Sequence, residues 1–333
     1  MDGRCARREK GISYAAELSN MDEARILAFP RRIMKILVIL NPGAGKGSSP
    51  DAENKTEEIA KAFQAVNVDA QIVCPGVSDL TAFTKRALIS HFDAVVAAGG
   101  DGTISAVAAA LVGTSTPLGI LPLGTLNHLA KDLKIPFDLQ EAARAIAEGK
   151  IHEIDVGEVN GRIFVNNSSI GLYPKAVRKR DQEIIRLGRG KWPAMLDASL
   201  RVFLRFPLIT IRLETSEGSL TSTTPFLFVG NNKYGMKFLR IGDRPSLERG
   251  ELCAYLLKHT GRLAFLRILL MAILGLRQDR DFTFILSREV QVQTRRRQIT
   301  VSADGQLMTL GTPLHYRIRP KALRVVAPKI AIP

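Results

Sequence analysis

The sequence has few aromatic residues and no long apolar run. Aromatic residues make up 6% of the 333 positions, and no basic stretch alternates with aromatic residues as a base-stacking surface requires. We therefore do not expect nucleic acid as a partner. The longest apolar run, residues 268–276, is less than half of the roughly 20 residues that a membrane-spanning helix needs.

Cysteines are also scarce. The three that occur, Cys5, Cys74 and Cys253, are widely spaced and match no metal-ligand pattern, so we expect free thiols in a reducing cytoplasm. The N-terminus lacks an apolar stretch before a small-residue cleavage site, and we do not expect secretion. Residues 1–33 are polar, charged and poorly periodic, which predicts a disordered extension or a misassigned start outside the folded unit.

Acidic residues are outnumbered by basic ones, 32 against 47, which gives a net charge of +15. A field of this sign attracts nucleic acid, anionic membrane or phosphorylated substrates, and does not choose among them. The excess is strongest in residues 175–205, where nine basic residues stand against three acidic ones with apolar residues between them. Such a stretch is either a solvated helix face or a surface that docks on anionic lipid.

Residues 94–111 are the segment around which the rest of the chain is organised. Residues 94–98 are small or apolar, three glycines then bracket Asp101, and mostly apolar residues follow to position 111. This pattern predicts a buried parallel strand, a tight turn and a helix N-terminus that favours a phosphate. Asp101 either faces a magnesium ion or a hydroxyl that loses its proton, or it only caps the helix that follows.

Two further predicted strands, residues 35–40 and 117–122, also end in polar loops that contain glycine. In an open parallel sheet such loops gather at the carboxyl edge, where ligands bind. From about residue 155 the sequence changes to short β-rich pieces with turns between them, which predicts an antiparallel β-sandwich. Two stretches within it, residues 193–206 and 262–276, are predicted to be helical, and the second is apolar almost all round, as buried helices are.

Four short motifs, in this order, resemble the diacylglycerol kinase catalytic-domain family. They are Asn41-Pro42 with Gly45 and Gly47, Gly99-Gly100-Asp101-Gly102-Thr103, Pro122-Leu123-Gly124-Thr125 with Asn127, and Asp304-Gly305. This family includes bacterial soluble lipid kinases and is related to sphingosine kinases. The glycine-aspartate-glycine motif alone is shared with NAD kinases and phosphofructokinases, but the combination is specific.

The resemblance implies a fold and a division of the chain. The N-terminal part, residues 34–153, is expected to be a three-layer, Rossmann-like α/β domain of the phosphofructokinase and NAD kinase type that binds the nucleotide. Residues 154–321 are expected to form an antiparallel β-sandwich that takes the lipid substrate, with residues 322–333 returning to the first domain. ATP and Mg²⁺ are expected in the cleft between the two.

The resemblance also implies site residues. Asp101 and Asp304 are the expected catalytic residues, and Asp101 is the expected magnesium ligand. The nucleotide-binding residues implied are Asn41, Gly45, Gly99, Gly100, Asp101, Gly102, Thr103, Ile104, Ser105, Gly124, Thr125 and Asn127. Asp304-Gly305 is alternatively a hairpin turn, which this dipeptide favours. Gln306 stands where the family has a glutamate, and a neutral amide cannot act as a base.

The activity implied is transfer of the γ-phosphoryl group of ATP to the hydroxyl of a membrane lipid, diacylglycerol first. The protein is then expected to be cytoplasmic and peripherally associated with an anionic membrane surface through residues 175–205. Two alternatives stay open: a catalytically weak regulatory protein that binds nucleotide and lipid, and a soluble kinase of the NAD or sugar type. The sequence leaves the oligomeric state open, with a homodimer as one option.

Overall fold

The computed structural model describes most of the chain from residue 33 onward. The described residues are 33–41, 49–76, 79–171, 208–234, 236–237, 240–241, 244–257 and 282–329, and those from Lys35 onward belong to one structural unit. The predictions for residues 1–32, for Pro42, Gly45 and Gly47, for the basic stretch 175–205 and for the helices at 193–206 and 262–276 lie outside them. Within the described part, no helix is long and apolar enough to cross a membrane.

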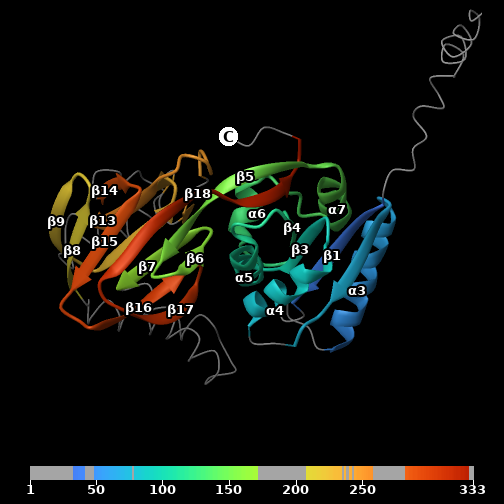
Figure 1. Cartoon of the computed structure of the whole chain (residues 1–333), viewed down its shortest axis with the longest axis horizontal. Coiled ribbons are helices and arrows are strands. Elements are labelled where there is room, and N and C mark those ends of the chain that lie inside the picture. Colours follow the sequence, from blue (N-terminus) through green and yellow to red (C-terminus); the bar gives the residue numbers. More distant parts are fainter. Residues whose placement is uncertain are drawn as a thin grey trace, which may run out of the picture. The chain divides into compact units, whose positions relative to one another are not determined.

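A parallel sheet forms the centre of the N-terminal part (Figure 1). Its strands are, in spatial order, β2 (Val68–Val73), β1 (Met34–Leu40), β3 (Ala94–Gly99) and β4 (Leu118–Pro122). Every residue of β3 is buried, and β3 pairs in parallel with β1 on one side and β4 on the other. A strand covered on both faces reads as a continuous apolar run, which is why residues 94–98 are recognisable in the sequence.

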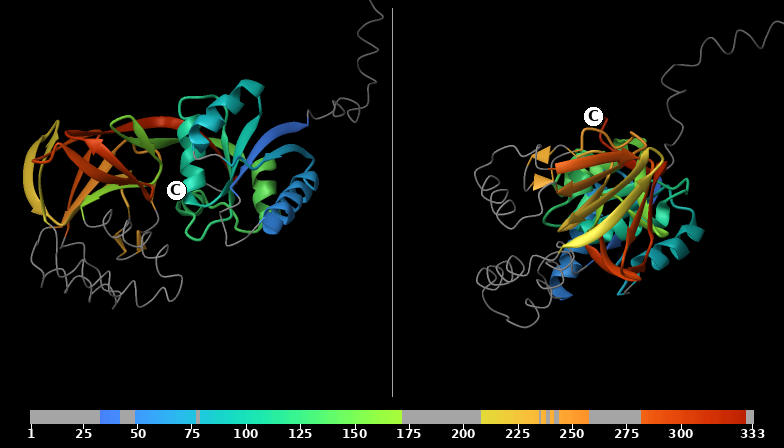
Figure 2. Two further views of the ribbon diagram at one scale, coloured as in Figure 1. Left: turned by 90° about the horizontal axis from the view of Figure 1, so that it is seen from below. Right: turned by 90° about the vertical axis from the view of Figure 1, so that its left-hand side faces the viewer.

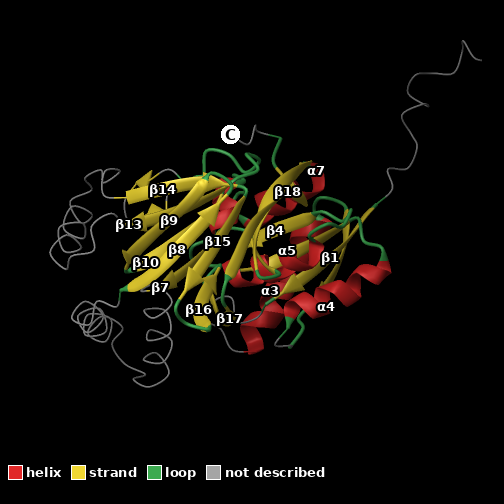
Figure 3. Ribbon diagram, turned by 60° about the vertical axis from the view of Figure 1, so that its left-hand side comes forward, coloured by secondary structure: helices red, strands yellow, loops and turns green. Residues whose placement is uncertain are grey.

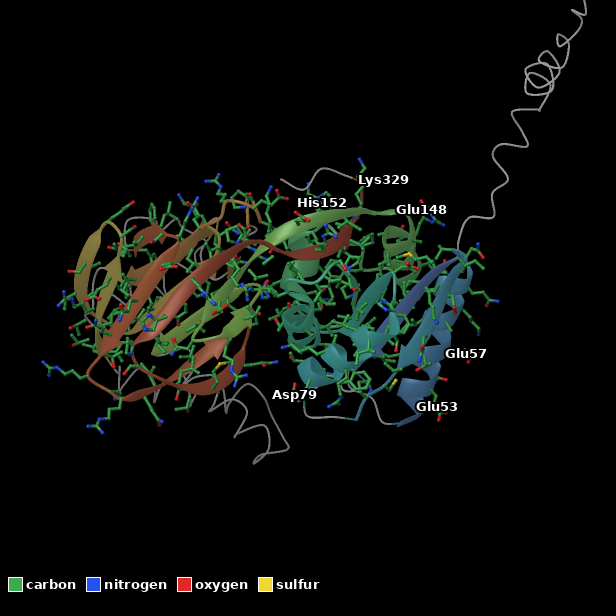
Figure 4. All side chains as sticks on the ribbon, viewed as in Figure 1. Glu53, Glu57, Asp79, Glu148, His152 and Lys329 are labelled. Carbon is green, nitrogen blue, oxygen red and sulfur yellow. The ribbon has the colours of Figure 1, made fainter. Side chains whose placement is uncertain are left out.

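Helices cover both faces of this sheet (Figure 2). Their bounds are α3 (Ser49–Gln64), α4 (Leu80–Ala87), α5 (Asp101–Leu111), α6 (His128–Asp132) and α7 (Leu139–Glu148). Helices α4 and α5 pack together, as do α3 and α7. Glu53 and Glu57 lie on the exposed side of α3, where Glu57 pairs with Lys61 at 2.7 Å (Figure 4).

The sheet continues from the N-terminal part into the C-terminal part through one long strand, β18 (Leu314–Ala327). Near its end β18 pairs in parallel with β4, and along its length it pairs antiparallel with β5 (Lys150–Val159) and β15 (Glu289–Thr294). Beyond β15 the sheet is completed by β8 (Ile209–Thr215) and β9 (Gly218–Thr224), and β6 (Arg162–Phe164) pairs with β5. The same strand therefore belongs to both parts.

A second sheet of six strands faces the first (Figure 3). Its order is β14 (Phe282–Ser287), β13 (Leu252–Leu257), β10 (Phe226–Asn231), β7 (Asn167–Gly171), β16 (Gln298–Ala303) and β17 (Gln306–Gly311). Alternate residues of both sheets meet in one apolar core that includes Phe164, Leu213, Val229 and Tyr316. The predicted fold class, a Rossmann-like α/β domain followed by an antiparallel β-sandwich, is confirmed.

Several strands escaped prediction in whole or in part. Strands β7, β9 and β17 were not expected, nor were the short strands β11 (Met236–Lys237) and β12 (Arg240–Ile241). In β7 and β9 most residues are polar or glycine, so apolar alternation is weak. For β18 only residues 315–318 were predicted. The strand continues past Pro320 through a β-bulge between Arg319 and Leu323, with Lys321 at a positive φ of 50°. Proline is tolerated at such a bulge because the ladder is already interrupted there.

Gly157→Ala tests the packing of β5 against β6. A Cβ added at Gly157 would lie 2.2 Å from atoms of the Phe164 ring, which is completely buried and would have to shift. We expect the free energy of unfolding to fall by about 1–3 kcal/mol in urea denaturation. Gly311→Ala is the matched control, since a Cβ there has no atom within 4 Å. Equal losses in the two variants would show that the contact is not the cause.

Candidate active site

The turn after β3 is held by hydrogen bonds at both ends. The amides of Thr103 and Ile104 donate to the Gly100 carbonyl, at 2.9 and 3.1 Å, which starts α5. The Thr103 hydroxyl accepts from Asn41 Nδ2 at 3.0 Å, so the end of β1 is tied to the first turn of α5. A Cβ at Gly99 would lie 2.5 Å from the Thr103 hydroxyl oxygen, and only glycine fits that position.

The loop after β4 packs against this turn backbone to backbone. A Cβ at Gly124 would lie 2.4 Å from the Gly100 Cα, so the loop after β4 has no room for a side chain at this contact. Asn127, at a positive φ of 50°, closes the loop: its Oδ1 accepts from the Gly124 amide at 3.1 Å and its Nδ2 donates to the Gly124 carbonyl at 2.8 Å. Close backbone approach of this kind is what a phosphate-binding edge requires.

The Asp101 side chain caps a helix, but not the one predicted. Its Oδ2 accepts from the Asn127 amide at 2.9 Å and its Oδ1 from the His128 amide at 2.7 Å, and these amides lie at the start of α6. The prediction that Asp101 caps its own helix α5 is wrong, because the N-cap of α5 is Gly100 and no side chain caps it. The Asp101 side chain therefore ties the first glycine turn to the second glycine loop.

Asp304 joins the β-sandwich to α5. Asp304 lies in the turn between β16 and β17 with a positive φ of 46°. The prediction that Asp304-Gly305 forms a hairpin turn is confirmed. Its carboxylate accepts four hydrogen bonds: Oδ2 from the Ser105 hydroxyl at 2.5 Å and the Val165 amide at 2.8 Å, and Oδ1 from the amides of Asn166 and Asn167 at 2.8 and 3.1 Å. Burial raises the pKa of Asp304 above its ordinary value, while these four donors act in the opposite direction.

The remaining predicted residues divide by exposure. Thr125 is exposed in the loop between β4 and α6, whereas the Ile104 side chain is buried in the core of α5. Gln306 begins β17, and its Nε2 lies 3.9 Å from where a Cβ of Gly102 would be, beside the first turn of α5. Within the described ranges, no group of three or more His, Cys, Asp or Glu side chains is placed to hold a metal ion.

The structure adds a buried ion pair that sequence reasoning missed. Arg244 Nη2 lies 2.7 Å from Asp132 Oδ2 at the end of α6, with 0% and 7% of the two side chains exposed. Its Nη1 donates to the Val165 carbonyl at 2.7 Å, next to the amides that bind Asp304. No motif marks either residue, and they are 112 positions apart.

Two buried hydroxyls lie beside Asp304. Ser302 and Ser169 are register partners in β16 and β7, and neither Oγ has a hydrogen-bond partner among the described residues. Ser168 points to the opposite side of the sheet, where its hydroxyl meets that of Tyr316 in the core. Ser169 and Ser302 therefore face outward from the sandwich.

Comparison with known proteins comes from sequence and from structure. Residues 35–159 match the family model of the diacylglycerol kinase catalytic domain. Diacylglycerol kinases of Staphylococcus aureus strains JH9 and Newman are each 32% identical over 140 residues, which cover 40% of this chain and 42% of theirs. The match thus spans less than half the length of these relatives.

Solved structures from Bacillus anthracis strain Sterne share the fold over nearly the whole described chain. A proposed diacylglycerol kinase has a TM-score of 0.71 at 23% identity, and a diacylglycerol kinase has a TM-score of 0.65 at 20% identity. Each alignment covers 90% of this chain and 98% of the other. At these identities the structures bear on the fold alone. Residues 35–159 are therefore similar to the diacylglycerol kinase catalytic domain, and three of the four motifs lie within this range.

Proposed function

We propose that this protein transfers the γ-phosphoryl group of ATP to the hydroxyl of a membrane lipid, with diacylglycerol as the first acceptor to test. The family supports a lipid kinase. The observation that carries the finer proposal is the Ser105–Asp304 hydrogen bond, because it sets the turn of the antiparallel sheet against the glycine turn of the α/β part. In this proposal residues 34–153 bind the nucleotide, residues 154–321 take the lipid, and the last part of β18 returns to β4.

The nucleotide site is proposed at the two glycine loops. Both have close backbone packing, and the first amides of α5 lie outside the helix's own hydrogen-bond ladder. Asp101 fits a magnesium ion, since its carboxylate has about four acceptor positions and accepts two hydrogen bonds from the described residues. With one carboxylate, such an ion would be held mainly by phosphate oxygens and water, as Mg²⁺ commonly is. When bound, it neutralises charge on the phosphates.

The proton of the lipid hydroxyl is assigned to Asp101. Asp304 accepts four hydrogen bonds, which fill its acceptor positions, whereas Asp101 accepts two and has capacity left. We therefore propose Asp101 as the general base. Asp304 then positions the sandwich against α5 and holds no proton of the substrate.

The lipid acceptor is proposed to approach along the outward face of the six-stranded sheet. From the edge near Asp304, one register row crosses this face through Ser302, Ser169, Phe228, Tyr255 and Phe284. Two buried hydroxyls without partners are followed by aromatic rings, an order that suits a polar headgroup followed by apolar chains. Peripheral attachment to anionic membrane through residues 175–205, and a homodimer, remain predictions.

One observation favours the regulatory alternative: the neutral Gln306 beside Gly102, where the family has a glutamate. Measuring ADP formation in the presence of ATP, magnesium and anionic vesicles distinguishes the lipid kinase from the regulatory protein. The kinase forms ADP at a rate that depends on diacylglycerol in the vesicles. ATP binding without ADP formation on any vesicle contradicts the proposed activity and favours the regulator.

Gln306→Glu tests which group acts as the base. Because Asp101 is assigned that role, we expect the rate to change by less than about tenfold, against the 10²–10⁴-fold that a general base contributes. The measurement is the initial rate of ADP formation with vesicles, and Gln306→Ala is the control for loss of the amide. A gain of a hundredfold or more would move the base from Asp101 to position 306.

A further inference from the structure

Arg244 is the largest of the fully buried side chains among the described residues. Its Nε and Nη2 both reach Asp132 Oδ2, at 2.8 and 2.7 Å, and its Cζ lies 5.5 Å from the centre of the Tyr234 ring. A fork of this kind fixes the orientation of the partner as well as its distance. A buried ion pair is weak support for stability, since apolar side chains of similar size often serve as well. Its presence therefore calls for another reason.

The Nε and Nη2 atoms of Arg244 bind Asp132 in α6, the helix whose first amides bind the Asp101 carboxylate. Asp132 is the last residue of α6, which has five residues and so spans about 7 Å at 1.5 Å per residue. At the other end of α6 are the two amides that bind the Asp101 carboxylate. A displacement of Asp132 thus moves the amides that orient Asp101.

Arg244 also binds residues 165 and 166, whose backbone amides donate to the Asp304 carboxylate. Arg244 Nη1 donates to the Val165 carbonyl at 2.7 Å, and Nη2 donates to Asn166 Oδ1 at 3.2 Å. The amides of Val165 and Asn166 are themselves donors to the Asp304 carboxylate. Arg244 and Asp304 therefore hold the same stretch of backbone from its carbonyl side and its amide side.

We propose that Arg244 is a positioning residue for phosphoryl transfer, which fixes the helix that orients Asp101 relative to the segment that orients Asp304. The inference rests on the proposed function. Arg244 lies outside every motif, and in this proposal it keeps the carboxylates of Asp101 and Asp304 fixed relative to each other. Lysine cannot replace Arg244, because an ammonium group lacks the planar fork that reaches both partners at once.

The test separates positioning from stability by removing both charges. Arg244→Met combined with Asp132→Leu leaves no unpaired buried charge. The Asn231 carbonyl and Asn166 Oδ1 lose a donor, so we expect a modest fall in Tm with the protein still folded, and kcat is compared per folded protein. We expect kcat for lipid phosphorylation to fall by about tenfold or more with KM for ATP changed less than about threefold, since small displacements of reacting groups are costly. The single variant Arg244→Lys is expected to have a kcat between that of the double variant and that of the wild type.

The matched control removes a second ion pair by the same changes. Arg324→Met with Glu153→Leu deletes an exposed pair between β18 and β5, with 42% and 45% of the side chains exposed. This variant is expected to keep the wild-type kcat. If the Arg244/Asp132 double variant has wild-type kcat as well, or if its kcat falls only in proportion to a loss of folded protein, the positioning role is overturned.

Hydrogen–deuterium exchange provides a readout without activity. In the Arg244/Asp132 double variant, amides of both residues 122–133 and residues 164–168 are expected to exchange faster, and the Arg324/Glu153 control is expected to leave both unchanged. Unchanged exchange at either segment overturns the coupling. If the wild type transfers no phosphate yet both segments respond, the proposed function fails while the coupling through Arg244 is supported.

Discussion

Asp101→Asn is expected to reduce lipid phosphorylation by at least about a hundredfold while the protein stays folded, because the change removes the proposed base. The amide that replaces the carboxylate keeps one acceptor oxygen and turns an NH₂ group toward the amide of Asn127 or His128. The cost of this weakened cap is about 1 kcal/mol, too little to unfold the domain. The measurements are initial rate, ATP affinity and thermal unfolding of the same preparation.

Asp138→Asn is the matched control for that experiment. Asp138 also caps a helix by accepting two backbone amides, those of Gln140 and Glu141, both at 3.0 Å, and it lies at the start of α7. Both amides donate to Oδ1, an acceptor that asparagine keeps, so we expect this variant to lose little stability and no activity. Retention of more than about a tenth of the wild-type rate by Asp101→Asn would remove Asp101 from proton transfer. Equal activity losses in the two variants would make the effect one of helix capping.

Asp304→Asn is expected to lower stability and activity together. Four donors converge on this carboxylate, and an amide side chain accepts from only one of its two ends. Each buried donor left without an acceptor costs about 1–3 kcal/mol, so a clear fall in the free energy of unfolding is expected. Activity falls because α5 and the β16–β17 turn are no longer fixed to each other.

Ser105→Ala tests the same contact with a smaller change. It removes one donor and leaves three on Asp304, so we expect a loss of about 1 kcal/mol in urea denaturation and a smaller fall in rate than for Asp304→Asn. The ordering of the three proteins, wild type, Ser105→Ala and Asp304→Asn, is expected to be the same for stability and for rate. An Asp304→Asn variant as stable as the wild type but inactive would contradict a positioning role and favour Asp304 as the base.

The sequence was informative where function depends on local backbone. The glycine turn before Asp101 could be predicted because a fully buried parallel strand is a continuous apolar run, and because a side chain at Gly99 or Gly124 would clash with its neighbours. The cap could not be assigned correctly, since the amides that bind Asp101 belong to residues 26 and 27 positions away. Propensity carries no information about such a partner.

Contacts between distant segments were the other limit. Ser105 and Asp304 are separated by 199 positions, and Asp132 and Arg244 by 112, so no spacing rule links either pair. Strand β18 could be predicted only in its first residues, because Pro320 and the exposed charged residues around it interrupt the apolar alternation that marks a strand. The rest of β18 is a strand because it pairs with β5 and β4, and these pairings are not visible in the local sequence pattern.

The most direct test of lipid phosphorylation is the identity of the labelled product. The full chain is incubated with γ-labelled ATP and magnesium, with anionic vesicles that contain diacylglycerol, sphingosine and phosphatidylglycerol, and with NAD and a free sugar in the same reaction. The account predicts label in a lipid, diacylglycerol first, and its loss in Asp101→Asn. Label on the soluble acceptors alone, or on no acceptor while ATP is bound, would contradict it.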